Sequence, residues 1–575
     1  MPTESAERAL REQFGLEAFR GPQEEAIGAV LEGRDLLLVM PTGGGKSLVY
    51  QLPAVVLDGL TLVISPLIAL MKDQVDSLVA RGIRATYVNS SLEAPERRKR
   101  LDAAVRGEID LLFVTPERFR SRDFLAAVKK LRIVRMAVDE AHCISHWGHD
   151  FRPDYSRLGE YRERIGNPPV VALTATATPA VAEDIVTRMR LCDPLVIRTG
   201  IERDNLFLAS TRVFDADEKI PILADRVRAI DGPGIVYSTL IRDLEALHQE
   251  LQRRGIQSLV YHGKLSKEER REMQDRFMSG SGDVVLATNA FGMGIDKEDI
   301  RFVLHAQVPR TLEAWVQEVG RAGRDGKPSW CEVLYFEEDI AIHQNFIQWA
   351  NPTLEYLVGV YEVLKGWGER VQAKDLDDLR DELLVKNRGD NRVSICMKWL
   401  EVLGVTSGSF DTHDLVLERE LSLDELPSFV GSEEKLKGDL TGLLQMTRFA
   451  SGDEECRRVS IHRYFGIELE GDSCHACDVC QKADEWLGEK MSPRSTEAVS
   501  LEREPDGTDE SAKKKRARPR FRRGDWVQVD NRHVGQVVRV EGEGKSLRIV
   551  VEDASDLRQR TIDPRRRRVK LVERR

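Results

Sequence analysis

The sequence of 575 residues lacks any uninterrupted apolar stretch long enough to span a bilayer. It also lacks a signal-peptide pattern at its first residues. These two absences argue against a membrane partner, and we expect a cytoplasmic protein. At this length the chain is too long for one hydrophobic core, so three to five domains are expected.

The sequence also lacks an excess of positive charge. Its net charge is −10, and this value by itself argues against a nucleic-acid partner. The distribution of charge argues the other way. Residues 513–575 hold 21 Lys and Arg against 9 Asp and Glu, a local balance of +12 that leaves −22 for the rest. A basic tail and one basic groove are enough for contact with nucleic acid, so a nucleic-acid partner is retained.

A glycine-rich loop follows a short apolar run that ends at Val39 and precedes a segment compatible with a helix. Glycines let backbone N–H groups close around phosphates, a lysine reaches the β- and γ-phosphates, and a hydroxyl binds Mg²⁺. Met40 stands where the first glycine of the usual pattern would be, so the strand-to-helix context carries much of the prediction. The predicted nucleotide-binding residues are Thr42, Gly43, Gly44, Gly45, Lys46 and Ser47.

Two adjacent carboxylates, Asp139 and Glu140, follow the apolar run 133–138. This places them at the carboxyl end of a buried strand. Asp139 is predicted to hold Mg²⁺ together with Ser47, and Glu140 to orient and deprotonate the attacking water. The glycine loop and the acidic pair together predict a motor that hydrolyses a nucleoside triphosphate.

Short apolar strands alternate with amphipathic segments over residues 1–205, and the scheme repeats over 206–350. This alternation is typical of parallel sheets flanked by helices, so the fold class is α/β with two parallel-sheet lobes. Polar motifs follow the strands, among them residues 174–178 in the first lobe and 317–326 in the second.

Four of the eight cysteines are clustered as Cys456, Cys474, Cys477 and Cys480. A cytosolic chain does not normally use such a cluster for disulfides. The spacing fits four thiolates around one Zn²⁺, and an iron–sulfur cluster is the alternative. His462 and His475 lie close enough to substitute for a cysteine.

Three segments surround this cluster or follow it. Helical spacing over 376–403 and two short strands within 405–419 predict a winged-helix-like segment over 351–430, with a helical spacer as the alternative. We then expect a zinc module over 431–482 and a flexible basic linker over 483–520. Alternating strands over 521–575 predict a small SH3- or Tudor-like barrel, whose arginines contact DNA phosphates or whose surface docks a protein.

The ordered motifs resemble the RecQ family of DNA helicases, of the bacterial type. The most specific match is the aromatic-rich segment 141–153, and the segments 14–23 and 290–296 and the cysteine cluster also match. The resemblance implies that the two lobes are RecA-like and that the protein is an ATP-dependent DNA helicase that uses ATP, Mg²⁺ and Zn²⁺. It also implies 3′→5′ movement on single-stranded DNA and unwinding of duplex or branched DNA in repair and recombination.

The resemblance also implies roles for individual residues. Arg20 and Gln23 would read the adenine, and Gln317, Arg321 and Arg324 would reach the ATP cleft from the second lobe, where a positive charge stabilises the transition state. Aromatic and guanidinium faces stack on unpaired bases without demanding a sequence. The predicted DNA-binding residues are Trp147, His149, Phe151 and Arg152. In the zinc module we expect a structural role, with DNA contact through Arg457, Arg458 and Arg463 as the alternative.

Two other functions stay open at this point. One is a nucleotide-switched DNA-binding scaffold that hydrolyses little ATP, and the other is an RNA helicase or remodeller. We expect a nucleoid-associated monomer that acts on single-stranded and branched DNA, with single-strand-binding or repair proteins as partners.

Overall fold

The computed structural model divides into two compact units, 1–496 and 497–575, which are treated separately below. It describes residues 2–148, 150–200, 203–280, 284–292, 295, 297–385, 387, 389–428, 430–468, 471–492, 494, 526–529, 533–541, 548–553, 559–562 and 569–573. Within these residues, none of the helices combines the length and the apolar character needed to cross a bilayer.

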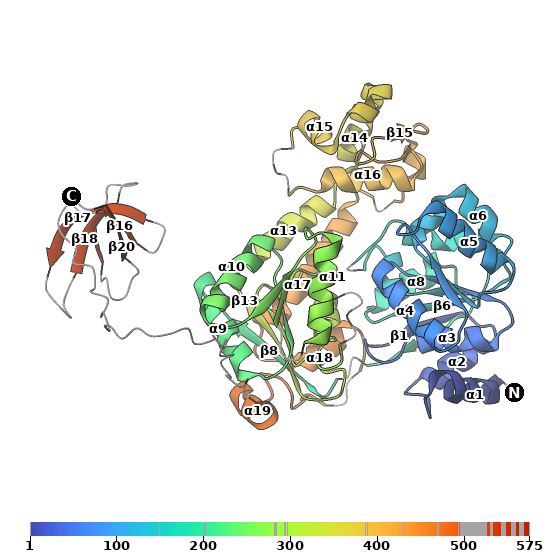
Figure 1. Cartoon of the computed structure of the whole chain (residues 1–575), viewed down its shortest axis with the longest axis horizontal. Helices are drawn as coiled ribbons and strands as arrows, with labels where there is room; N and C mark the ends of the chain where they lie inside the picture. Colours follow the sequence, from blue (N-terminus) through green and yellow to red (C-terminus); the bar gives the residue numbers. More distant parts are fainter. Residues whose placement is uncertain are drawn as a thin grey trace, which may run out of the picture. The chain divides into compact units, whose positions relative to one another are not determined.

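Lobe 1, drawn mainly in blue in Figure 1, contains a seven-stranded parallel sheet with the strand order β3-β4-β2-β5-β6-β1-β7. The inner strands β1, β2, β4 and β6 are buried along their whole length, and β5 is buried from Arg135 on, because helices cover both faces. The strands are β1 Leu36–Val39, β2 Leu60–Ile64, β3 Ala85–Val88, β4 Leu111–Val114, β5 Ile133–Val138, β6 Val170–Thr174 and β7 Leu195–Arg198. The helices are α1 Pro2–Phe14, α2 Gln23–Leu31, α3 Leu48–Val56, α4 Ile68–Ala80, α5 Ala94–Val105, α6 Arg122–Val128, α7 Leu158–Arg164 and α8 Pro179–Arg188, with short 3₁₀ turns η1 Pro116–Arg120, η2 Ala141–Ile144 and η3 Tyr155–Arg157.

Lobe 2 repeats the plan as a six-stranded parallel sheet with the order β10-β11-β9-β12-β13-β8. The first strand after the junction, β8, therefore lies at an edge. The strands are β8 Leu206–Arg212, β9 Gly234–Tyr237, β10 Ser258–Tyr261, β11 Val284–Ala287, β12 Phe302–His305 and β13 Ser329–Tyr335. The helices are α9 Ala216–Ala229, α10 Ile241–Arg253, α11 Lys267–Ser279, α12 Leu312–Val319 and α13 Asp339–Ala350.

An accessory segment follows α13 and has its own apolar core (Figure 1, in yellow). Three helices precede a short antiparallel hairpin, which is the composition that the sequence predicts for a winged-helix-like segment. The elements are α14 Leu354–Trp367, η4 Gly368–Ala373, α15 Leu376–Glu382, α16 Arg392–Val402, β14 Thr406–Ser407, β15 Val416–Leu417 and η5 Leu423–Glu425.

The chain then returns to lobe 2 through α17 Glu433–Ser451, α18 Arg457–Tyr464 and the cysteine loop. The linker predicted over 483–520 is wrong at its start, because 483–490 form a helix, α19 Ala483–Lys490. Trp486 of this helix is buried in the core of lobe 2, with ring centroids 4.9 Å from Phe207 and 6.1 Å from Trp330. A buried tryptophan offsets the entropy of ordering a charged segment, and composition alone did not show this.

The second unit contains a five-stranded antiparallel sheet in the order β19-β18-β17-β16-β20. Strands occur at the three places where alternation predicts them, and two more follow. They are β16 Trp526–Val529, β17 His533–Glu541, β18 Arg548–Asp553, β19 Gln559–Ile562 and β20 Val569–Glu573. The SH3- or Tudor-like barrel stays a prediction, and residues 501–525 and Arg565–Arg568 lie outside the described residues.

Candidate functional site

The glycine-rich loop joins the carboxyl end of β1 to the amino end of α3. Gly43 and Gly45 have φ angles of +80° and +79°, in the left-handed region that favours glycine. The Lys46 Nζ lies within the loop and donates hydrogen bonds to the carbonyls of Met40, at 2.9 Å, and Pro41, at 3.2 Å. Burial lowers the pKa of Lys46. A lysine enclosed by a loop at a helix amino end is the arrangement that receives phosphates.

Gln23 packs directly on this loop from the start of α2. Its buried amide donates to the carbonyls of Gly44 and Gly45, both at 3.2 Å, and its oxygen accepts from the backbone N–H of Arg20 at 2.8 Å. The structure thus brings Gln23 to the nucleotide loop, while the Arg20 side chain is exposed. Recognition of adenine by the two side chains stays a prediction.

The acidic pair lies at the carboxyl end of β5, and β6 beside it pairs in turn with β1, the strand that leads into the glycine loop. Glu140 adopts a left-handed conformation with φ +51°, which is uncommon for a glutamate and typical of functional sites. The Tyr155 hydroxyl donates to the Asp139 carbonyl at 3.2 Å. Burial lowers the pKa of Lys46, and the carboxylates of Glu140 and Asp139 oppose this lowering, so the pair and the lysine share one electrostatic site.

The two carboxylates have the character of a divalent-cation site. Burial, followed by the neighbouring Glu140, raises the pKa of Asp139 to about 7. The buried Oε2 of Glu140 accepts no hydrogen bond from the described residues, although His142 Nδ1 is 3.4 Å away. Carboxylate and hydroxyl oxygens are the ligands that Mg²⁺ prefers, so Asp139 with Ser47, the residue that precedes α3, fits this ion.

His142 connects the acidic pair to the end of β6. Its Nδ1 lies 2.9 Å from Thr174 Oγ1, which donates to the Thr176 carbonyl at 3.1 Å. His142 is buried, so this chain of contacts is screened from solvent. The polar motif at 174–178, which follows a strand in the sequence, is thereby joined to the acidic pair.

Lobe 2 meets the glycine loop through the end of α12 and the turn that follows it. The Thr42 hydroxyl donates to the Gly320 carbonyl at 3.1 Å. Arg324 packs on Gly43, where a Cβ would lie 3.7 Å from the Arg324 Cγ. Gln317 and Thr42 line one small cavity of about 40 Å³ between the lobes. Arg324 and Gln317 therefore reach the nucleotide loop from the other lobe.

Arg321 is placed differently from the other two residues predicted from lobe 2. It is buried and donates to the Gly292 carbonyl within its own lobe. The turn that bears it is held by Arg203, whose Nη2 donates to the carbonyls of Ala322 and Gly323, both at 2.6 Å. Sequence reasoning missed Arg203. Its position at the junction of the two lobes is the one signal that points to it.

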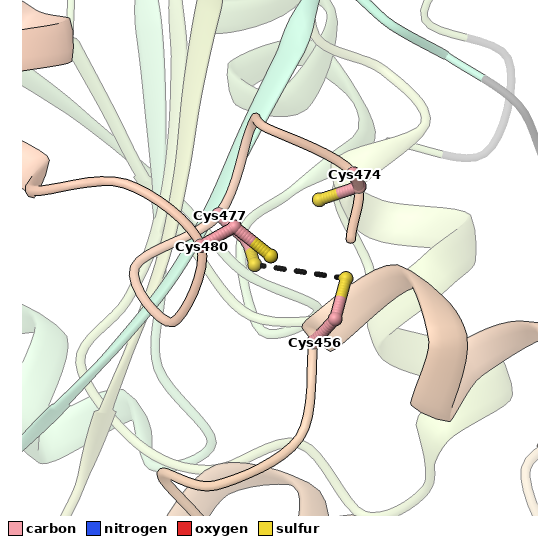
Figure 2. A group of neighbouring side chains, drawn as sticks. All are labelled: Cys456, Cys474, Cys477 and Cys480. Carbon is pink, nitrogen blue, oxygen red and sulfur yellow. Dashed lines mark hydrogen bonds between the residues drawn. The ribbon is translucent and has the colours of Figure 1, made fainter. Parts of the chain in front are cut away.

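The four clustered cysteines come together as the spacing predicts. Their sulfur atoms all lie within 4.8 Å of one another, and Figure 2 shows the side chains of Cys456, Cys474, Cys477 and Cys480 converging on one point. The Ala476 N–H donates to the Cys474 sulfur at 3.4 Å, so a backbone group supports one ligand. Four converging thiols fit a closed tetrahedral zinc centre, in which no position is left for catalysis.

The cysteine loop also covers the edge strand of lobe 2. The Leu208 N–H of β8 donates to the Ala476 carbonyl at 3.1 Å, and the Asp478 N–H donates to the Leu208 carbonyl at 3.0 Å. The Asp478 carboxylate accepts from the Ser210 N–H at 2.8 Å. An open sheet edge invites wrong pairing, so the zinc loop protects β8 as well as holding itself together.

Two arginines of α18 are structural, which differs from the DNA contacts considered for them. Arg457 is buried and forms an ion pair with Asp478 at 2.8 Å. Arg458 is buried and donates to the carbonyls of Arg203, at 2.6 Å, and Leu206, at 3.0 Å. Arg458 therefore anchors the junction between the lobes. Arg463 is exposed and forms an ion pair with Glu455.

Trp147 of the aromatic-rich loop is available to a ligand, with 42% of its surface exposed. Its backbone N–H donates to Ser145 Oγ at 3.2 Å, and that hydroxyl donates to Asp184 of α8 at 2.7 Å. The loop is thus fixed at its base and begins directly after His142. An exposed ring on an anchored loop is suited to stacking on an unpaired nucleobase.

Phe151 is not available in the same way. Its ring stacks on Trp399 of α16, with centroids 6.1 Å apart and planes at 26°, and it packs against the accessory core. Charged contacts extend this interface, since Arg120 pairs with Glu401 and Lys398 with Asp154 at 3.4 Å. In this structure the accessory segment therefore covers the phenylalanine that the sequence predicts to stack on DNA.

The other two predicted DNA-binding residues are Arg152 and His149. Arg152 donates to Asp150 Oδ2 at 3.1 Å and to the Pro66 carbonyl at 3.4 Å. His149 lies outside the described residues. The DNA contacts of both stay predictions.

Three family models match successive parts of the chain. They are a DEAD/DEAH box helicase over 20–185, a helicase conserved C-terminal domain over 218–326, and a RecQ zinc-binding module over 414–481. The last match, together with the cluster geometry, favours zinc over an iron–sulfur cluster at Cys456, Cys474, Cys477 and Cys480.

Curated relatives cover the chain to different extents. The probable ATP-dependent DNA helicase RecS of Bacillus subtilis is 37% identical over 506 residues, which are 86% of this chain and 97% of the relative. The ATP-dependent DNA helicase RecQ of the same organism is 43% identical over 60% of this chain and 58% of its own length. The helicase hus2/rqh1 of Schizosaccharomyces pombe is 41% identical over 86% of this chain but 32% of its own length. With two helicase lobes and a cysteine cluster of RecQ type in one compact unit, the chain belongs to the RecQ family of helicases.

Proposed function

We propose that this protein is an ATP-driven DNA helicase that moves 3′→5′ on single-stranded DNA. It unwinds duplex or branched DNA in repair and recombination. The observation that carries the proposal is the approach of Arg324 from lobe 2 to Gly43 of the nucleotide loop in lobe 1. A site shared between two lobes makes hydrolysis depend on the distance between them, which is the requirement for a motor.

Lobe 1 binds ATP and activates the attacking water, and lobe 2 completes the site. Lys46 reaches the β- and γ-phosphates, and Glu140 orients the attacking water and accepts its proton. Arg324 and Gln317 stabilise the charge that builds on the transferred phosphoryl group. Bound at Ser47 and Asp139, Mg²⁺ would neutralise charge on the phosphates.

DNA is the proposed substrate because Trp147 stands exposed on a fixed loop that begins at the hydrolytic residues. The contacts that run from Glu140 through His142 to this loop offer a route by which a bound DNA strand stimulates hydrolysis. The DNA helicase names of the relatives support the same choice. We infer a monomer at the nucleoid in the cytoplasm, with single-strand-binding or repair proteins as partners.

The test compares duplexes that carry a single-stranded tail at one end. With ATP and Mg²⁺, we expect strand separation of a duplex with a 3′ DNA tail and little separation of its 5′-tailed counterpart. Separation of the 5′-tailed duplex alone would contradict the proposed direction. Single-stranded DNA should stimulate ATP hydrolysis, and stronger stimulation by RNA would favour an RNA helicase instead.

A further inference from the structure

Helix α17 belongs to lobe 2 but reaches the aromatic-rich loop of lobe 1. Its carboxyl-terminal half lies in the core of lobe 2, where Met446, Phe449 and Ala450 are buried. The Phe449 ring is 4.7 Å from that of Trp315 on α12. The helix is therefore a rigid part of lobe 2, and any contact that its other half makes with lobe 1 depends on how the lobes are placed.

The amino-terminal half of α17 meets the ring of Trp147 at a glycine. A Cβ at Gly438 would lie 2.9 Å from Cζ3 and 3.0 Å from Cε3 of the ring, closer than side chains approach one another. The ring thus rests on the helix backbone at Gly438. A groove of about 730 Å³ opens beside this contact, and Trp147 keeps 42% of its surface exposed there.

The residue after this glycine binds lobe 2 at the start of α12. The Asp439 carboxylate accepts hydrogen bonds from Arg310 at 2.8 Å, Asn351 at 2.7 Å and Lys435 at 3.0 Å. Arg310 lies directly before the Thr311 cap of α12. At its other end α12 leads into Gly320, whose carbonyl accepts the hydrogen bond from Thr42 of the nucleotide loop. One helix therefore touches both the DNA-binding loop and the element that completes the ATP site.

We propose that α17 positions Trp147 and α12 relative to each other, so that a strand stacked on Trp147 favours closure of the ATP site. Gly438 is the positioning residue on the lobe 1 side, and Asp439 is the positioning residue on the lobe 2 side. The inference rests on the proposed function, because it assigns the coupling between the DNA and ATP sites to named residues. Stacking holds the ring in one orientation, and the rigid helix then favours the lobe arrangement that fits that orientation.

The test substitutes Gly438→Ala. Alanine is a better helix former than glycine, so the helix itself is not weakened, but the added methyl group displaces the Trp147 ring. We expect the maximal stimulation of ATP hydrolysis by single-stranded DNA to fall by about fivefold or more. We expect hydrolysis without DNA to stay at the wild-type rate. Gly359→Ala on α14 is the matched control, because nothing lies within 4 Å of its added Cβ.

A double-mutant cycle separates coupling from a merely structural role. If Gly438 acts through Trp147, Gly438→Ala should have no further effect on stimulation in a Trp147→Ala background. Asp439→Asn leaves the contact with Trp147 in place and weakens the ion pair with Arg310. It should lower stimulation in the same way, with hydrolysis in the absence of DNA unchanged.

Each result decides between the alternatives. Stimulation of wild type and Gly359→Ala but not of Gly438→Ala would support the proposal. Equal stimulation of Gly438→Ala and wild type would overturn it. Additive effects of the two substitutions in the double-mutant cycle would also overturn it. So would a fall in the rate measured without DNA, in Gly438→Ala and Asp439→Asn, as large as the fall in the DNA-stimulated rate. If wild type itself were not stimulated by DNA, the proposed function would fail, and the inference would fail with it.

Discussion

Glu140 is held in a left-handed backbone conformation beside a buried aspartate. Such strain costs about 1–3 kcal/mol and persists where the surroundings impose it. We expect Glu140→Gln to keep the shape of the site and to lose the proton acceptor. The rate of DNA-stimulated hydrolysis should fall by about 10²–10⁴-fold while ATP binding is kept.

A steady-state ATPase assay and a nucleotide-binding titration check this expectation. Glu163→Gln is the control, since this glutamate is exposed on α7 of the same lobe. Glu140→Gln with more than a tenth of wild-type hydrolysis would exclude Glu140 as the general base.

A second prediction at the residue scale concerns Arg324, whose side chain packs on Gly43 across the lobe boundary. Removing an arginine that stabilises a transferred phosphoryl group lowers kcat by about 10³-fold or more. We expect this loss in Arg324→Ala, measured as kcat at saturating DNA. Arg242→Ala on α10, an exposed arginine of the same lobe, should match wild type. Unchanged kcat in Arg324→Ala would contradict a site completed by lobe 2.

Much of the ATP site could be predicted from sequence for a physical reason. Lys46 and Asp139 each follow a buried strand, and the carboxyl ends of parallel strands meet at one edge of a sheet. Gln23 and Arg321 were also singled out, yet their actual partners, the Gly44 and Gly292 carbonyls, depend on loop conformations that a sequence pattern does not encode.

At the scale of elements, the zinc loop supports the edge strand β8. Loss of the metal should therefore destabilise lobe 2 as well as the loop. We expect Cys477→Ser, or treatment with a strong chelator, to cost about 3 kcal/mol, which would lower the Tm of a lobe of this size by about 6–12 °C. Thermal unfolding together with measured zinc content checks this.

Cys192→Ser is the matched control for zinc, because Cys192 is exposed and lies outside the cluster. It should keep its zinc and its Tm. If Cys477→Ser lost its zinc and unfolded at the wild-type temperature, the metal would have no part in holding β8.

The accessory segment is docked on lobe 1 by the stack of Trp399 on Phe151. Replacing a buried tryptophan by alanine costs roughly 3 kcal/mol. The accessory segment should then detach from lobe 1 about a hundredfold more often. We expect Trp399→Ala to accelerate hydrogen–deuterium exchange in 150–157 and 392–402.

Trp367→Ala is the control for this experiment, because Trp367 packs against the accessory core and its ring centroid lies 5.4 Å from the Nζ of Lys374 in the same segment. It should accelerate exchange in the accessory segment and leave 150–157 protected. Equal protection of 150–157 in wild type and Trp399→Ala would mean that the stack does not hold the segment on lobe 1.

At the scale of the whole molecule, contacts between distant parts of the chain were the least predictable. Arg458 of the zinc module anchors the junction at Arg203, and Gly438 supports the ring of Trp147. No local pattern marks such residues, because their partners are more than two hundred residues away and lie on other domains. The start of the predicted linker, 483–490, was wrong for the same reason, since Trp486 packs in the core of lobe 2.

We propose that ATP turnover at the shared site of the two lobes drives the separation of DNA strands. The most direct test is the unwinding of a duplex with a 3′ single-stranded DNA tail by wild type, Lys46→Ala and Arg324→Ala, with ATP and Mg²⁺. We expect strand separation by wild type alone. Separation by Lys46→Ala at the wild-type rate would contradict it, as would DNA-stimulated hydrolysis by wild type without any separation.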